Sequence, residues 1–223
     1  MSAPVAVLGG AFNPVHFGHI RSARELREQL GLAEVRLMPT GLPPHRPAPE
    51  LSSERRAQLV RMAVENEPGL VCDERELHRP GPSYTIDSLT ELRRELGPSR
   101  GLALVIGADV VAGLEQWRRW RELFDLAHLV IIGRPGYPAL PERGPVAQWL
   151  LRHLSTDKGA LRDSAGGVAL RVELSPMNIS ATEIRAALAA GRCVRHLLPD
   201  PVWRHIQQHR WYAAGAATHV GGP

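Results

Sequence analysis

Apolar residues in this chain follow two patterns that take turns along its length. Six short apolar segments predict strands, at residues 5–8, 34–39, 70–72, 101–106, 129–132 and 168–174. Apolar residues at helical spacing predict helices at residues 20–30, 53–66, 146–154 and 200–211, one ending at residue 96 and one running from 180 to 191. The last strand segment alternates apolar and charged residues, so we expect it nearer a sheet edge. Because strands and helices alternate without a repeat or a clear linker, we predict an α/β fold with one doubly wound parallel sheet.

The turn between the first strand and the first helix contains three glycines and two histidines of interest. Gly9 and Gly10 lack a Cβ, so the backbone can turn sharply and a ligand can approach the main chain closely. Gly18 and His19 fall near the first helical turn, where unpaired N–H groups and the helix dipole favour a bound anion. His16 brings a second imidazole to the same place. A single histidine here would ordinarily cap the helix or lie in solvent, but two beside a double glycine favour a phosphate site.

Polar residues also follow the other predicted strands. The loop at residues 40–49 carries His45 and Arg46 among four prolines, and it is either a binding loop or a surface connector. Asp109 follows the fourth strand, where it is either a helix N-cap or an acceptor for ribose or base donors. Arg134 lies between glycine and proline after the fifth strand, well placed to meet a phosphate. Trp117 is flanked by arginines and can stack on a heteroaromatic ligand or cover the sheet edge.

The helix that begins near Ser180 is the second candidate for binding an anion. Ser180 and Glu183 have the spacing of a capping box, which is the ordinary structural interpretation. Thr182 and Arg185 lie three positions apart, so both project from one side of the first helical turn toward whatever the helix start binds.

Composition changes this picture little. A length of 223 residues, of which 43% are hydrophobic and 22% charged, suits one α/β domain, assigned to residues 1–212, while residues 213–223 are expected to be disordered. No apolar run approaches the roughly 20 residues that span a bilayer, and no basic leader precedes the first strand. We therefore expect a cytoplasmic protein with no membrane partner.

Charge and cysteine content exclude two further classes. The net charge is +4 and the pI about 9.7, yet the arginines are scattered with acids between them. Solvated helix surfaces explain most of them, so no nucleic-acid partner is expected. The acidic residues within 73–76 are interpreted as a solvated connection. Cys72 and Cys193 form no CxxC pair, so we expect two buried, small apolar side chains and no protein-held metal.

Together the motifs resemble a known family. Residues 9–19, Gly-Gly-Ala-Phe-Asn-Pro-Val-His-Phe-Gly-His, are similar to the GGxFxPxHxGH signature of the nucleotidyltransferase superfamily, and residues 179–185 are similar to its ISxTxxR motif. The intervening segments Pro-Pro-His-Arg (43–46), Pro-Ser-Tyr-Thr (82–85), Gly-Ala-Asp (107–109) and Arg-Pro-Gly-Tyr (134–137) resemble those of bacterial nicotinate-nucleotide adenylyltransferases. The resemblance covers nearly the whole chain and implies a Rossmann-like nucleotidyltransferase fold.

The same resemblance implies an activity and its residues. It implies adenylyl transfer from ATP to nicotinate mononucleotide, giving deamido-NAD and pyrophosphate, with Mg²⁺ carried largely by phosphates. The catalytic residues it implies are His16, His19 and Arg185. Those implied for ATP are Gly9, Gly10, Phe12, Gly18, Gly107, Asp109, Ser180 and Thr182. Those implied for nicotinate mononucleotide are His45, Arg46, Tyr84, Thr85, Trp117 and Arg134.

Two residues depart from the family pattern, and two other functions compete. Asn13 stands where many members have aspartate, which favours a role in the turn over a charge that orients Mg²⁺. Arg118 stands where relatives can carry an aromatic residue.

The first competing function is adenylyl or cytidylyl transfer to a pantetheine or alcohol phosphate on the same scaffold. The second is a synthetase-like RNA-binding protein, which would require a clustered basic face.

Overall fold

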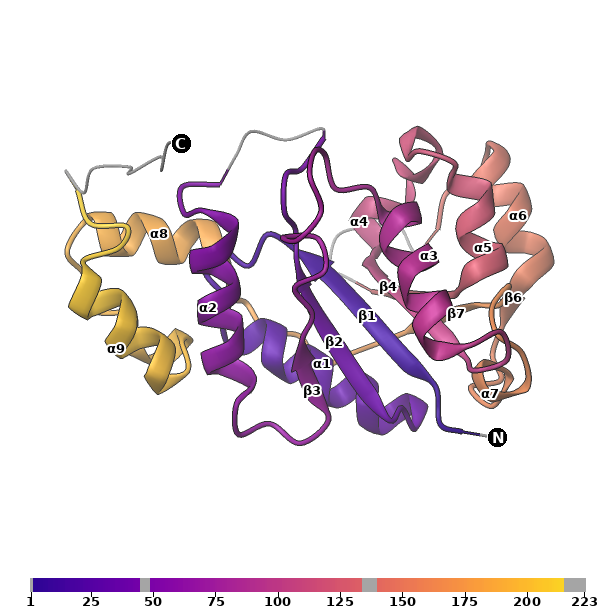
Figure 1. The fold of residues 1–223 in the computed structure, drawn as a ribbon, viewed down its shortest axis with the longest axis horizontal. Helices are drawn as coiled ribbons and strands as arrows, with labels where there is room; N and C mark the ends of the chain where they lie inside the picture. Colours follow the sequence, from indigo (N-terminus) through magenta and orange to yellow (C-terminus); the bar gives the residue numbers. More distant parts are fainter. Residues whose placement is uncertain (1, 45–48, 134–139, 215–223) are drawn as a thin grey trace.

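The computed structural model describes residues 2–44, 49–133 and 140–214, and these contain one seven-stranded sheet in which every pairing is parallel. The strand order is β3-β2-β1-β4-β5-β7-β6 (Figure 1). The strands are β1 (Val5–Gly10), β2 (Glu34–Pro39), β3 (Leu70–Cys72), β4 (Leu102–Gly107), β5 (His128–Ile132), β6 (Leu154–Ser155) and β7 (Ala169–Val172). The predicted doubly wound parallel sheet is confirmed.

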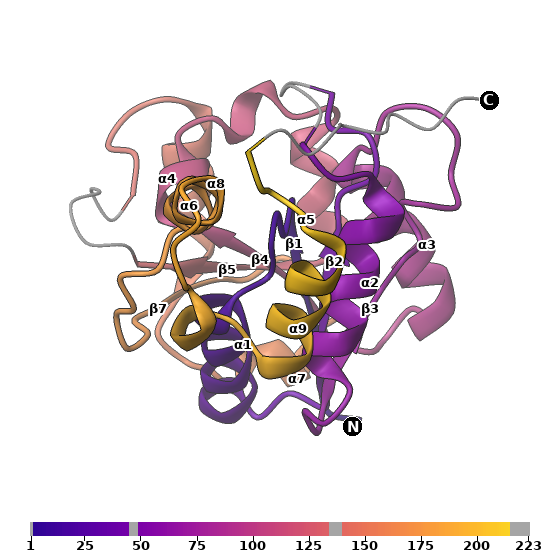
Figure 2. The same cartoon turned by 90° about the vertical axis from the view of Figure 1, so that its left-hand side faces the viewer.

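Helices cover both faces of this sheet. They are α1 (Phe17–Leu30), α2 (Ser53–Val64), α3 (Thr85–Leu96), α4 (Ala108–Val111), α5 (Leu123–Leu126), α6 (Pro145–His153), α7 (Ala160–Asp163), α8 (Ala181–Ala189) and α9 (Asp200–His209), with 3-10 turns η1 (Leu114–Gln116), η2 (Trp120–Glu122) and η3 (Arg195–Leu197). Figure 2 shows α1, α2, α8 and α9 on one side of the molecule. None of the described helices is long and apolar enough to cross a membrane.

Alternating side chains of the central strands divide the core in two. Ala6 of β1 packs with α1, α2, α8 and α9, whereas its neighbour Val7 packs with α3, α5 and α6. β4 divides in the same way, since Ala103 and Val105 belong to the first cluster and Leu104 to the second. Successive residues of a strand point to opposite faces, so a continuous apolar run is what a sheet covered on both sides requires.

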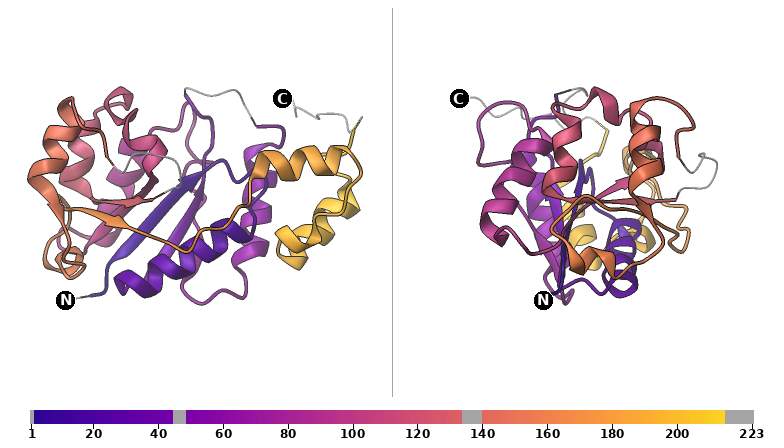
Figure 3. Two further views of the ribbon diagram at one scale, coloured as in Figure 1. Left: turned by 180° about the vertical axis from the view of Figure 1, so that it is seen from behind. Right: turned by 90° about the vertical axis from the view of Figure 1, so that its right-hand side faces the viewer.

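After β7 the chain crosses to α8 and α9 at the other end of the sheet (Figure 3). This crossing is tied to α1, because the Ser175 N–H donates to Oε2 of Glu25 at 2.8 Å and Nε2 of Gln29 donates to the Glu173 carbonyl at 3.2 Å. The crossing brings the helix near residue 180 back to the side of the sheet where α1 lies.

The predicted elements agree with the structure except in short or charged segments. The first helix begins at Phe17, three residues before the predicted start, because the turn residues 17–19 are already helical. β7 lies one strand in from the edge, next to β6, as its alternating pattern predicts. The sequence did not predict α7 and β6, which have four and two residues, too few to show a period. The predicted disorder of residues 213–223 falls almost entirely outside the described residues.

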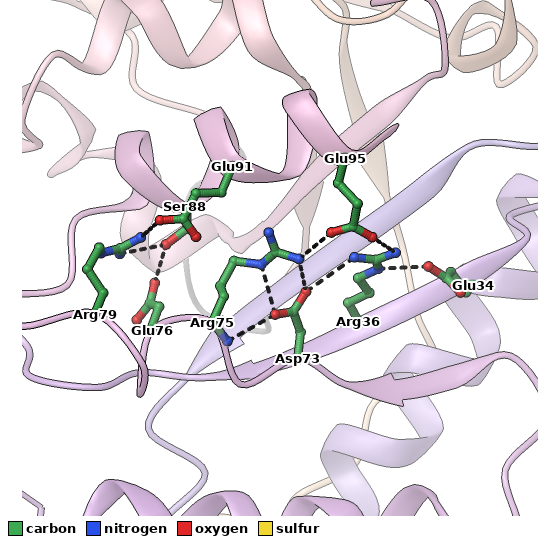
Figure 4. A network of polar contacts seen from close by, with 9 residues as sticks. All are labelled: Glu34, Arg36, Asp73, Arg75, Glu76, Arg79, Ser88, Glu91 and Glu95. Carbon is green, nitrogen blue, oxygen red and sulfur yellow. Dashed lines mark hydrogen bonds and ion pairs between the residues drawn. The ribbon is translucent and has the colours of Figure 1, made fainter. Parts of the chain in front are cut away.

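The acidic segment after β3 is buried in a salt-bridge network, so its interpretation as a solvated connection is wrong (Figure 4). Asp73 and Glu76 are each 8% exposed. The Asp73 carboxylate accepts from Arg75 at 2.8 and 2.7 Å and from Arg36 at 3.4 Å, and Glu95 of α3 pairs with both arginines at 2.8 Å. The Arg36 hydrogen bond lowers the pKa of Glu95 to about 2. Asp73 and Glu95 lie between β2 and α3, where Arg36 and Arg75 neutralise them, whereas Glu76 accepts a hydrogen bond from the Ser88 hydroxyl at 2.8 Å.

The expectations for cysteine and arginine also need correction. Cys193 is exposed and Cys72 half-buried, so neither is fully buried. Solvated helix surfaces were expected to explain most arginines, but Arg56 is 1% exposed and lies on the buried face of α2. Its spacing from Leu59, Val60 and Ala63 already places it on that face.

The buried imidazole that begins β5 provides a test of the fold by pH. His128 is 0% exposed, with Nε2 2.9 Å from the Ser164 carbonyl oxygen and Nδ1 accepting from the Val168 N–H at 3.3 Å. Burial lowers the pKa of His128 below its ordinary value, so the folded state holds a neutral ring. Its contribution to stability is complete above the unfolded pKa of about 6.5 and is lost as pH falls through the folded pKa.

We expect His128→Asn to cost about 1–3 kcal/mol of unfolding free energy at neutral pH, because buried partners lose a hydrogen bond. Urea denaturation of both proteins measures this difference in unfolding free energy at each pH. The difference should shrink between about pH 7.5 and about pH 5, because the unfolded parent takes up a proton on His128 at low pH and the Asn variant has no such group. A difference that does not change with pH would contradict a neutral, buried His128.

Candidate active site

The carboxyl ends of β1 and β2 form one side of the candidate site. Gly9 and Gly10 pair with Met38 and Pro39 at the last positions of the two strands. A Cβ added at Gly9 would meet nothing within 4 Å, so this backbone is open to a ligand. At Gly10 the same atom would lie 3.3 Å from the ring of Phe12, which is buried. The predicted close approach of a ligand therefore suits Gly9 best.

The two histidines stack at the start of α1. Their ring centroids are 3.7 Å apart, and Phe12 meets His19 edge-on at 5.0 Å. The His16 N–H donates to Nδ1 of His19 at 3.3 Å, so the neutral His19 ring carries its proton on Nε2 and offers a donor there. Gly18 has no room for a side chain, because its Cβ would lie 2.9 Å from Nδ1 of His16. The turn thus packs two imidazoles against backbone that only glycine allows.

Two distant segments converge on Asn13 in this turn. Nη1 of Arg185 donates to the Asn13 carbonyl at 2.8 Å, and the Tyr212 hydroxyl donates to Asn13 Oδ1 at 2.6 Å. Burial raises the pKa of Tyr212, so its hydroxyl stays protonated and donates. Asn13 is buried and meets both partners through oxygen atoms, which agrees with the turn role predicted for it. Sequence reasoning missed Tyr212, which no local pattern connects to Asn13.

The start of α8 lies beside the start of α1. A Cβ built on Gly18 would be 3.7 Å from Cβ of Ile179, the residue before the helix cap. Arg185, one turn into α8, has a side chain 24% exposed and also donates through Nε to Oε1 of Glu50 at 3.0 Å. The sequence motifs at residues 9–19 and 179–185 are therefore brought together.

The capping box expected at Ser180 and Glu183 is wrong. Ser180 is the N-cap in extended conformation, but its side chain makes no cap hydrogen bond, and Glu183 is exposed. Thr182 is exposed on the same first turn. The first N–H groups of α8 therefore have no side-chain oxygen from its cap residue, which leaves them for water or a ligand.

The carboxyl end of β4 adds a third wall. Gly107 ends β4 and is also the N-cap of α4. Asp109 is the second residue of α4 and half-buried, so its alternative assignment as the N-cap is wrong. Its place on this edge, next to β1, remains the one predicted for an acceptor of ligand donors.

The start of α3 forms a neighbouring part of the edge. Tyr84 is the N-cap in extended conformation and Thr85 the first helical residue. Tyr84 and half-buried Trp117 pack on the same core cluster, and the guanidinium of Arg118 lies 4.7 Å from the Tyr84 ring centroid. Arg118 therefore covers the Tyr84 ring at the start of α3, where the pyridine is predicted to bind.

The loop after β2 is fastened to this start of α3. The Ser83 N–H donates to the Leu42 carbonyl at 2.8 Å, and the Leu42 N–H donates to Ser83 Oγ at 3.2 Å. Gly41 donates to Oε2 of Glu76 at 3.3 Å. Ser83 and Glu76 were not predicted as site residues. The predicted ligand residues His45, Arg46 and Arg134 lie outside the described residues.

Across the described ranges, no group of three or more His, Cys, Asp or Glu side chains could hold a metal ion.

Comparison with known proteins agrees with this geometry. The family model described as "Cytidylyltransferase-like" matches residues 7–187. A protein of Halorhodospira halophila, named a "Probable nicotinate-nucleotide adenylyltransferase", is 47% identical over 93% of this chain and 94% of its own length. One of the same name from Hahella chejuensis is 44% identical over 95% of this chain and 97% of its own. The solved structure of Plasmodium falciparum nicotinic acid mononucleotide adenylyltransferase complexed with NaAD has a TM-score of 0.69 at 14% identity, covering 95% of this chain and 98% of that one.

The fold and the paired helix starts define a nucleotidyltransferase, and the chain belongs to the cytidylyltransferase-like family. Within that class it belongs to the nicotinate-nucleotide adenylyltransferases, the enzymes of NAD biosynthesis to which its full-length relatives are assigned.

Proposed function

We propose that this enzyme transfers the adenylyl group of ATP to nicotinate mononucleotide, and that the paired starts of α1 and α8 hold the ATP phosphates. The observation that carries the proposal is the closeness of the starts of α1 and α8, where a Cβ built on Gly18 would lie 3.7 Å from Cβ of Ile179, together with the Arg185 contact to Asn13. Two helix N-termini, two imidazoles and one guanidinium then surround one place. Each favours an anion, and together they suit a triphosphate.

The ATP residues divide by the part of the nucleotide they face. His16 and His19 face the α-phosphate, beside the open backbone of Gly9. Ser180, Thr182 and Arg185 bind the β- and γ-phosphates from α8. The adenosine lies against the end of β4. The complete ATP set is Gly9, Gly10, Phe12, Gly18, Gly107, Asp109, Ser180 and Thr182, with His16, His19 and Arg185 as catalytic residues.

Nicotinate mononucleotide binds at the adjacent start of α3. The N–H groups of Tyr84 and Thr85 receive the pyridine carboxylate, because the positive end of a helix favours a charged oxygen over an amide. Trp117 stacks on the ring. His45, Arg46 and Arg134 meet the mononucleotide phosphate. Both binding sites belong to one domain, residues 1–212.

The chemistry needs position and fixed donors more than a protein nucleophile. A phosphate oxygen of the mononucleotide attacks the α-phosphorus of ATP, a new P–O bond forms, and the bond to the bridging oxygen breaks to release pyrophosphate. Negative charge grows on the phosphoryl oxygens, where the Nε2 donor of His19 and the guanidinium of Arg185 stabilise it. Mg²⁺ enters with the ATP phosphates as part of the substrate and neutralises charge on them.

A comparison of acceptors tests this function. Pyrophosphate release from ATP is measured with nicotinate mononucleotide, with its amide counterpart and with phosphopantetheine. We expect the acid mononucleotide to give the highest kcat/KM, by at least about tenfold, because a carboxylate gains charge-assisted hydrogen bonds that an amide lacks. A preference for phosphopantetheine would assign the chain to a different acceptor. Salt-dependent RNA binding without pyrophosphate release would revive the RNA-binding alternative.

A further inference from the structure

A buried guanidinium joins the two loops that leave β1 and β2. Arg56 of α2 donates through Nη1 to the Ala11 carbonyl at 2.6 Å and through Nη2 to the carbonyls of Thr40 and Gly41, at 2.6 and 3.4 Å. Its Nε donates to the Leu51 carbonyl at 3.2 Å. One planar group therefore contacts the glycine-rich turn, the loop after β2 and the start of its own helix.

These contacts lie just beyond the last paired residues of β1 and β2. The β1–β2 register ends at Gly10 and Pro39, and the next backbone bond runs from the Thr40 N–H to the Gly10 carbonyl at 2.9 Å. Ala11 and Thr40 are the first residues beyond that register. Arg56 bridges their carbonyl groups, so it continues the connection between the strands past the last ladder bond.

Stability alone is a weak reason for a charge at this position. Arg56 is 1% exposed on a face otherwise made of Leu59, Val60 and Ala63, and its described hydrogen-bond partners are all backbone carbonyls. Burial lowers the pKa of Arg56 even though the carboxylates of Glu54 and Glu76 act in the opposite direction. Desolvation of a buried guanidinium offsets part of what its hydrogen bonds contribute to stability. What an apolar side chain cannot do is hold three backbone segments at once.

We propose that Arg56 is a positioning residue, which sets the distance between the turn that binds ATP and the loop that faces the mononucleotide. This inference rests on the proposed function. The loop is closely packed on its side of the bridge, since a Cβ at Gly41 would lie 2.6 Å from the Glu76 carbonyl oxygen and 2.8 Å from Ser83 Oγ. Through Ser83 the same bridge reaches the start of α3. Arg56 thus fixes both reactants relative to each other without touching either.

The chain contains a matched control in Arg93 of α3. Its guanidinium also donates to backbone carbonyls, at Gly97, Arg100, Leu126 and Ala165, over 2.6 to 3.1 Å. Burial lowers the pKa of Arg93 as well. Its partners precede β4, β5 and β7, so they lie at the amino ends of the strands, away from the site. Both arginines donate to backbone carbonyls, Arg56 at the carboxyl ends of the strands and Arg93 at their amino ends.

Arg56→Lys and Arg93→Lys keep the positive charge but lose the planar guanidinium, which donates several hydrogen bonds at once. Both should lower the Tm. Assayed about 20 °C below its own Tm, Arg56→Lys should lose at least about tenfold in kcat while both KM values change less than about threefold, because misplaced reactants still bind but react slowly. Arg93→Lys should keep kcat within about twofold. Arg56→Gln, which removes the buried charge, guards against failure to fold and should show the same loss of kcat.

Each outcome shows whether Arg56 positions the reactants or only stabilises the fold. If the folded Arg56 variants lose no more kcat than Arg93→Lys, the inference is overturned. It is also overturned if neither Arg56 variant folds while Arg93→Lys does, since Arg56 then serves stability alone. The parent enzyme is assayed in the same reaction. If it does not release pyrophosphate with nicotinate mononucleotide, the proposed function fails, whereas an active parent with an active Arg56→Lys contradicts only the role of Arg56.

Discussion

His19→Ala is expected to lower kcat by at least about 100-fold, the cost of losing one fixed donor to a developing phosphoryl charge. The geometry supports a donor role, because Nδ1 of His19 accepts the His16 N–H at 3.3 Å and leaves the proton on Nε2. His19 is half-buried and its imidazole accepts the His16 N–H, so the substitution should lower the unfolding free energy by about 1 kcal/mol and leave the fold intact. Steady-state pyrophosphate release and urea denaturation measure the two effects separately.

Two amide variants separate the two roles of His19, which are donation through Nε2 and acceptance of the His16 N–H through Nδ1. His19→Asn places an amide near Nδ1 and can still accept the His16 N–H, but it has no group at Nε2. His19→Gln places its amide near Nε2 and retains a donor. We expect His19→Asn to be as inactive as His19→Ala and His19→Gln to recover part of the activity. An unchanged rate in His19→Asn would remove His19 from the chemistry and leave it a structural cap.

Arg185→Lys is expected to raise the KM for ATP by about tenfold to 100-fold while the KM for the mononucleotide changes little. Arginine can grip phosphate with two parallel donors and lysine cannot, and a hydrogen bond to a charged group contributes about 1.5–3 kcal/mol. In the structure the guanidinium lies beside the glycine-rich turn, where it donates to the Asn13 carbonyl at 2.8 Å and to Glu50 at 3.0 Å. Initial rates over a range of ATP concentrations give the result.

Glu50→Gln is the control for this prediction. Its carboxylate occupies Nε of Arg185, so its loss should leave the KM for ATP unchanged or lower it. An Arg185→Lys enzyme with an unaltered KM for ATP would contradict the assignment of Arg185 to the phosphates, and Arg185 would then only support the Asn13 turn.

The sheet and its main helices could be predicted because apolar periodicity reports directly on burial. The continuous apolar run of β4 predicts a strand covered on both faces, and its side chains do divide between two cores. Local patterns fail where burial depends on a partner far along the chain. Asp73 looks solvated until Arg36 and Glu95 are placed around it (Figure 4). Charge alone does not reveal which acids are paired.

In the candidate site too, local patterns predicted some features, and contacts between distant residues set the others. Motif spacing predicted that two helix starts bind one ligand, and the parallel topology brings them to one place. It did not predict what holds them there. Arg56 could have been found, since its helical spacing puts it on the apolar face of α2. Tyr212 and Ser83 could not, because their partners are set by tertiary folding and no sequence period points to them.

The hydrogen bond from Tyr212 to Asn13 also has a consequence for biosynthesis. The two residues are 199 positions apart, so a growing polypeptide makes the acceptor long before the donor exists. The glycine-rich turn therefore receives this contact only after residue 212 has been synthesised. For protein engineering, a deletion that reaches residue 212 acts on the catalytic turn itself, although it removes residues from the far end of the sequence.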